Sequence, residues 1–198
     1  MSFLRLAGAA AVLLSLGLFA RALPMNLLGD INVHALAATD GVSCALNKLI
    51  EADIIGKING CVHLDSLADV SVALNACIEL IKACSDELLK IGATVTLDAK
   101  AKEDIVAFVA AIITLFVKVC LQLTLKFGVA AVARIFADID LCIKLLLVNL
   151  NVCVDGIIAL VLNALVSVTV GLMPQLNLAV CASLFASLGA VAGVSIGN

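Results

Sequence analysis

Apolar residues recur at helical spacing along most of the chain, and signals for strands joined by tight turns are sparse. Proline occurs only at Pro24 and Pro174, so little interrupts the predicted helices. Ser66 and Asp69 resemble a capping box, and Gly92 is placed to end the helix that follows it. The predicted helices cover residues 42–58, 66–91, 98–127 and 129–148, a fifth that ends near 170 after a break at 149–151 or 156, and 178–188. We expect a single all-α domain, a compact bundle of five or six helices.

Three of these helices are predicted to place cysteine on one face and charge on the opposite face, at 100° per residue. On helix 66–91, Cys77 and Cys84 face away from Glu79, Lys82, Asp86 and Lys90. On helix 98–127, Cys120 lies opposite Asp104, Thr114, Lys118 and Gln122. If helix continues from 138 to 155, Cys142 and Cys153 lie opposite Asp140, Lys144, Asn151 and Asp155. This pattern indicates a core of disulfides or buried thiols beneath a strip that faces water.

A polytopic membrane protein is a further interpretation. Segments 105–127, 141–162 and 178–197 are each long enough to cross a bilayer. Their charges form stripes along the helices, however, whereas a membrane span carries charges at its ends or in a functional cavity. The chain also has no Trp or Tyr for an aromatic belt. The pattern therefore favours a very apolar bundle in water over a set of membrane spans.

The N-terminus has the features of a secretory signal peptide. Residues 2–5 carry one charge, residues 6–19 are apolar and uncharged, and Ala20-Arg21-Ala22 has the small-x-small pattern of a cleavage site. The apolar run is too short for a first membrane helix, which is the alternative interpretation. We expect cleavage before Leu23, which leaves a secreted helical domain over residues 23–198.

Composition argues against an ordinary soluble enzyme, because 64% of the 198 residues are hydrophobic and only 14% are charged. It also excludes a disordered chain and a basic nucleic-acid binder. Residues 23–104 are the more polar part and residues 105–198 are strongly apolar, with no charged side chain after Asp155. Apolar surface should therefore remain exposed in patches that meet a partner, lipid or an air–water boundary. The candidate contact residues, each also a candidate for the core, are Leu172, Met173, Leu176, Leu184, Phe185 and Leu188.

Eight cysteines behind a signal peptide predict four disulfides in an oxidising compartment. They are Cys44, Cys61, Cys77, Cys84, Cys120, Cys142, Cys153 and Cys181. Their pairing stays open, because eight cysteines allow 105 combinations. A metal site would need closer cysteine pairs than the tightest one here, Cys77-x₆-Cys84, so no metal is expected.

Catalytic chemistry has little support in the sequence. The two histidines, His34 and His63, stand in unrelated contexts, and Glu103 and Asp104 fit the acidic first turn of a helix better than an acid/base pair. The chain has no G-x-S-x-G, P-loop, G-x-G-x-x-G or H-E-x-x-H motif. We therefore expect a protein that is not an enzyme and binds no cofactor.

The spacing of the cysteines distinguishes this chain from several families of cysteine-rich secreted proteins. It has neither the Cys-Cys doublet and C-x-C of plant lipid transfer proteins nor the two doublets of hydrophobins. In layout it resembles small secreted proteins of mushroom-forming fungi, which combine a signal peptide, a more polar N-terminal half, an apolar C-terminal half and eight cysteines without doublets. The resemblance implies a role in the cell wall or extracellular matrix.

The expected function is that of a secreted amphiphilic structural protein at cell-wall, matrix or air–water interfaces, in attachment or surface coating. Its expected partners are further copies of itself, hydrophobic surfaces and cell-wall material, with no nucleic acid. The alternative is a secreted helical protein that binds or transfers lipid, and a polytopic membrane protein comes third.

Overall fold

The computed structural model describes residues 35–192 except positions 39, 93–94, 166 and 177. The predicted signal peptide and His34 lie outside these residues. The prediction of an all-α fold is confirmed, since all regular secondary structure in the described part of the chain is helical. The α-helices are α2 (Gly41–Glu51), α3 (Ile54–Gly60), α4 (Leu67–Ile91), α5 (Ala99–Phe127), α6 (Val129–Cys153), α7 (Ile157–Ala164), α8 (Ser167–Leu172) and α9 (Ala179–Ala192), with 3-10 turns η1 (Cys61–His63) and η2 (Pro174–Leu176).

The described residues thus form eight α-helices, more than the five or six predicted, because two predicted helices are divided. The predicted helix 42–58 breaks at Asp53, whose backbone has a left-handed φ of 51°. Asp53 then caps α3, since its Oδ1 accepts a hydrogen bond of 3.1 Å from the Gly56 amide. The predicted fifth helix is likewise divided into α7 and α8, whereas α6 continues five residues past its predicted end at Val148 to Cys153.

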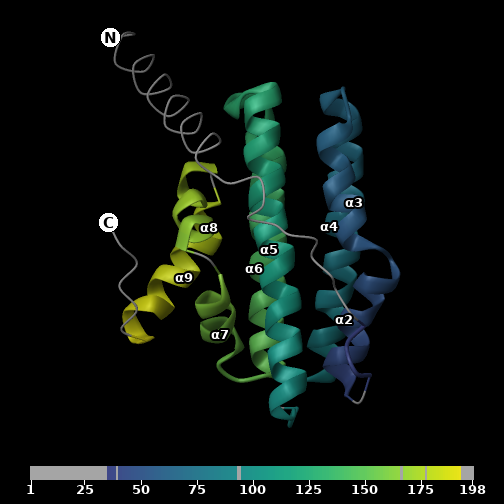
Figure 1. Cartoon of the computed structure of the whole chain (residues 1–198), viewed down its shortest axis with the longest axis vertical. Helices are drawn as coiled ribbons and strands as arrows, with labels where there is room; N and C mark the ends of the chain where they lie inside the picture. The colour runs from purple at the N-terminus through teal and green to yellow at the C-terminus, as the bar shows by residue number, and fades with distance from the viewer. Residues whose placement is uncertain (1–34, 39, 93–94, 166, 177, 193–198) are drawn as a thin grey trace.

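Three long helices, α4, α5 and α6, run along the long axis of the molecule (Figure 1). The two shorter helices α2 and α3 lie on one side of them, and α7, α8 and α9 lie on the other. Gly128, with φ of 87°, reverses the chain between α5 and α6, so these two helices are antiparallel. The reversal brings α6 beside α4 with the same direction.

Helices α4 and α6 are joined by hydrogen bonds between small polar groups. Asn149 Nδ2 of α6 donates to the carbonyl oxygen of Ser85 at 3.0 Å and to its hydroxyl at 2.9 Å. On either side of Asn149 along α6, the thiol of Cys142 donates to the carbonyl oxygen of Ile78 and the thiol of Cys153 donates to that of Leu88. The partners are 64, 64 and 65 residues apart in sequence. The two helices are therefore parallel, with residue n of α4 level with about residue n+64 of α6.

The core is continuous from the segment before α2 to α9, and its largest fully buried side chains include Phe116, Phe136 and Phe185. Helix α5 is the most deeply enclosed element. It is also the one described helix that is long and apolar enough to cross a membrane, although 72% of its most apolar window is buried inside the protein. Helix α7 and residues 169–176 would make a second such element only as one span bent by 96°.

Candidate functional site

Four large apolar side chains of α6 are exposed and line up along one face of the helix. They are Leu141, Leu145, Val148 and Val152, with exposed fractions between 37% and 53%. Their spacing of four, three and four residues keeps them within an arc of about 60° at 100° per residue. We call this set the α6 stripe. The described part of the chain has other exposed apolar side chains, such as Val72 at 71%, but not in such a row.

Charged residues border the α6 stripe on both sides. At 100° per residue, Asp138 lies on the side of the stripe that faces α4, and Lys144 lies on the side that faces α9. The pKa of the Lys82 ammonium is raised mainly by the hydrogen bond that it donates to Glu79 and more weakly by the charge of Asp138, so Lys82 of α4 lies near Asp138. The stripe is therefore an apolar band between two charged edges.

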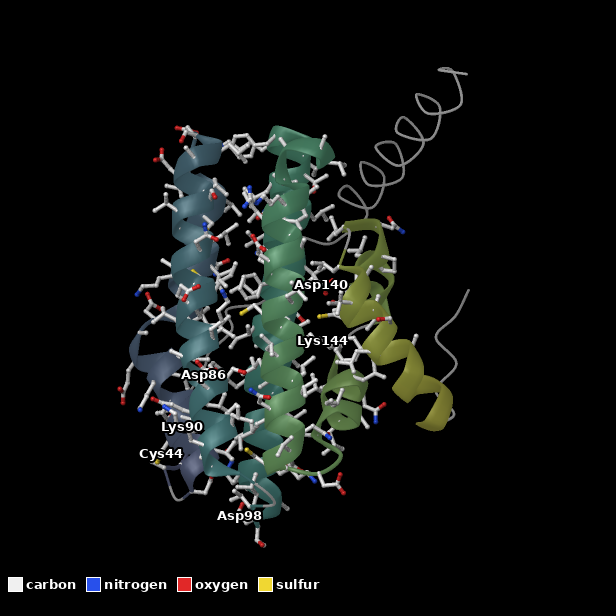
Figure 2. The ribbon with its side chains drawn as sticks, turned by 180° about the vertical axis from the view of Figure 1, so that it is seen from behind. Cys44, Asp86, Lys90, Asp98, Asp140 and Lys144 are labelled. Carbon is white, nitrogen blue, oxygen red and sulfur yellow. The ribbon has the colours of Figure 1, made fainter. Side chains whose placement is uncertain are left out.

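The charged row predicted for helix 66–91 is exposed as expected: Glu79, Lys82, Asp86 and Lys90 all face solvent. Lys82 and Glu79 form an ion pair of 2.9 Å. Asp86 and Lys90 follow along the same helix, on the opposite side of the molecule from α9 (Figure 2). Leu89, 58% exposed, lies level with the C-terminal end of the α6 stripe.

The prediction that Asp140 faces water is wrong. Lys144 and Asp155 are exposed and Asn151 is half-buried, but Asp140 is only 2% exposed. Its carboxylate accepts hydrogen bonds from the amides of Val180 at 2.7 Å and Cys181 at 2.8 Å. These amides belong to the first turn of α9, where no intrahelical acceptor is available. Figure 2 shows Asp140 on the side of α6 that α9 covers. Asp140 thus caps α9 from another helix, a role that the pattern within α6 could not reveal.

The predicted stripe on α5 is less exposed than expected. Gln122 faces solvent, while Asp104, Thr114 and Lys118 are half-buried. Asp104 forms an ion pair of 3.4 Å with Lys100 one turn earlier. The preceding Glu103 is exposed, so the two neighbouring carboxylates diverge around the helix.

All eight cysteines are free thiols in this structure, so it does not show the predicted disulfide framework. Seven are buried and Cys44 is exposed. Besides the two thiols that bond α6 to α4, Cys84 donates to the carbonyl oxygen of Ala45 and Cys181 donates to that of Asp140. Cysteine acts here as a small apolar residue with a weak donor that fits between closely packed helices.

Burial makes most of these thiols hard to ionise. It raises the pKa of Cys84 and of Cys142 to about 12, and it raises the pKa of Cys120 and Cys181 as well. Cys61 is the exception. Interaction with the neighbouring Cys77 thiol lowers the pKa of Cys61, and the same interaction raises that of Cys77. The Cys61 thiol also donates a hydrogen bond of 3.2 Å to the carbonyl oxygen of Lys57.

The apolar residues predicted as surface contacts lie mainly in the core. Leu172, Met173, Leu176 and Phe185 are buried. Leu184 is partly buried against the core, and the side chain of Leu188 lies outside the described part of the structure. The exposed apolar row is on α6 instead. Its spacing is present in the sequence, but α6 is apolar over so much of its circumference that the pattern did not distinguish this row from the core.

The described residues contain no group of three His, Cys, Asp or Glu side chains placed to hold a metal ion. His63 is exposed in η1, a turn that does not belong to the α6 stripe. Comparison of the chain with protein families, characterised proteins and solved structures finds no match. The function is therefore inferred from the geometry of this structure.

Proposed function

We propose that the protein is a secreted, non-enzymatic amphiphilic protein that adsorbs to, or assembles at, apolar boundaries such as a cell-wall, matrix or air–water surface. The observation that carries this proposal is the α6 stripe, an exposed apolar row on a helix whose opposite face is buried in a continuous core. A row of this kind costs free energy in water, and contact with an apolar phase removes that cost.

The charged edges of the stripe support adsorption in a defined orientation. Asp138 and Lys144 border the stripe, and the row from Glu79 to Lys90 runs along the neighbouring helix. Interfacial helices combine an apolar face with a charged face in this way, which lets the apolar band enter the boundary while the charges remain hydrated. The resemblance to secreted eight-cysteine proteins of mushroom-forming fungi leads to the same class of function.

We further propose that disulfides staple the secreted form, beginning with Cys61 and Cys77, whose thiols are near enough to shift each other's pKa. The thiolate of one of these cysteines attacks oxidised glutathione and releases one reduced glutathione. Exchange of the resulting mixed disulfide with the second cysteine gives the bridge and a second reduced glutathione. Mass spectrometry of peptides from protein alkylated without reduction tests this bridge. Recovery of Cys61 and Cys77 as alkylated thiols from secreted protein would overturn it.

The experiment that tests the function compares surface activity among three proteins. The variant Leu145→Lys with Val148→Lys places two charges in the stripe, while Val72→Lys with Leu125→Lys places two charges at exposed apolar positions outside it. We expect the native protein and the control to lower the surface tension of water, and the stripe variant to lose most of this effect. Circular dichroism establishes that each variant is folded.

Two results would overturn the proposal. One is a native protein that leaves surface tension unchanged and does not bind hydrophobic surfaces. The other is a folded stripe variant that is as active as the native protein. Recovery of a stoichiometric lipid from the purified protein would instead support the lipid-carrier alternative.

A further inference from the structure

The α6 stripe has the spacing of a helix-packing surface. Leu141, Leu145, Val148 and Val152 follow each other at steps of four, three and four residues. These are the steps between successive d and a positions of a heptad, the spacing with which one helix packs along another. The regular row therefore fits another α-helix, and the chain itself provides one with the same row.

From this stripe we infer that two copies of the protein pair through α6, with the two α6 helices parallel about a two-fold axis that runs along them. The inference rests on the proposed function, because it concerns the same stripe and says what the stripe binds when the protein is in solution. It names that partner as a second copy of this chain, and a two-fold interface of this kind is self-complementary.

Charge decides between the parallel and antiparallel arrangements. In the parallel one, rotation about the two-fold axis carries α4 of one copy over the Lys144 side of the other copy's α6. The hydrogen bonds between α4 and α6 place Glu79 level with residue 143, next to Lys144. Glu79 of one copy therefore meets Lys144 of the second copy, and the contact occurs twice. Both side chains are exposed, and Glu79, which pairs with Lys82 on its own helix, reaches Lys144 of the second copy from the surface.

The antiparallel arrangement brings like charges together. With the stripe centred between Leu145 and Val148, α4 of one copy lies over α4 of the other, and Glu79 comes level with Asp86 of the second copy. Both residues are carboxylates, so this arrangement adds repulsion where the parallel one adds two attractive pairs.

A charge exchange tests the pairing, with association measured by sedimentation equilibrium of the purified protein. We expect the native protein to dimerise, and Glu79→Lys and Lys144→Glu each to weaken the dimer about tenfold. The double variant restores the opposite charges and should recover most of the native affinity. Glu103→Lys changes the net charge by the same amount on α5 and should leave the dimer intact.

Cross-linking tests the direction of the helices, in a Cys44→Ser background that removes the exposed native thiol. Position 145 lies beside itself in the parallel dimer and beside position 148 in the antiparallel one. Mild oxidation of Leu145→Cys alone should therefore give a covalent dimer. A cross-link that forms only between Leu145→Cys and Val148→Cys molecules would overturn the parallel arrangement.

Association and surface activity separate this inference from the proposed function. A native protein that is monomeric but lowers surface tension overturns the dimer and leaves the proposed function standing. A dimer disrupted by Glu79→Lys and restored by the charge exchange, in a protein without surface activity, supports the dimer and overturns the proposed function. A double variant that is no better than the single variants also overturns the pairing of Glu79 with Lys144.

Discussion

Replacement of Asp140 should release α9 from the rest of the bundle. In the Asp140→Ala variant the amides of Val180 and Cys181 lose their acceptor, at 2.7 and 2.8 Å, a carboxylate that is only 2% exposed. A hydrogen bond to a charged group contributes about 1.5–3 kcal/mol, and a donor left unsatisfied adds to the loss. We expect the free energy of unfolding to fall by about 3 kcal/mol. Asp140→Asn keeps one carbonyl oxygen, so about half of the effect should remain.

Urea denaturation followed by circular dichroism measures this loss. With an m value of about 2–3 kcal/mol/M, the midpoint should move down by about 1 M. The matched control is Asp138→Ala, which removes an exposed carboxylate one half-turn earlier on the same helix and should change stability by less than about 0.5 kcal/mol. Hydrogen exchange should show that the amides at the start of α9 lose protection first.

The reasoning fails if Asp140→Ala is as stable as Asp138→Ala, or if protection at the start of α9 is unchanged. Either result would mean that the apolar contacts of α9 hold it in place without the cap. A loss of stability spread evenly over all helices, with no preference for α9, would assign Asp140 a role in the whole core instead.

Three other perturbations have definite expected outcomes. Asn149→Ala should cost about 1–3 kcal/mol of stability in urea denaturation, because it removes two buried hydrogen bonds to Ser85 and leaves the Ser85 hydroxyl without this donor; an unchanged midpoint would contradict this. Gly56→Ala should destabilise the protein, since its Cβ would lie 2.2 Å from the carboxylate that caps α3, whereas Gly60→Ala meets nothing within 4 Å and should be neutral or slightly stabilising in thermal melts. Burial raises the pKa of Cys84 and Cys142 from 9.0 to about 12 in the reduced protein, so the folded state keeps these protons up to a higher pH than the unfolded state does. The stability that these protonated thiols contribute is complete below pH 9 and should fall as the pH rises from 9 toward 12; a denaturation midpoint that stays constant over this range would contradict the expectation.

The ends of the long helices could be predicted from the sequence because local groups set them. The hydroxyl of Ser66 accepts the Asp69 amide at the start of α4, and the carboxylate of Asp98 accepts the Ala101 amide at the start of α5. Gly128 ends α5 with a positive φ, as expected for a residue without a side chain. These signals act within one turn of the backbone, so they are visible without knowledge of the fold. The break at Asp53 was missed because a left-handed aspartate inside an apolar pattern has no comparable signal.

Which apolar side chains are exposed was decided by the tertiary structure. The sequence by itself determined that the chain is helical, that its C-terminal half has more apolar residues than charged ones, and that α4 has a charged face. Helices in residues 105–198 are apolar over most of their circumference, so the pattern within one helix does not decide which face is buried. Packing decided it. Leu172, Met173, Leu176 and Phe185 lie in the core, Asp140 caps α9, and the α6 stripe is exposed because no described helix covers it. A helix pattern describes one element, whereas exposure depends on which neighbours that element meets.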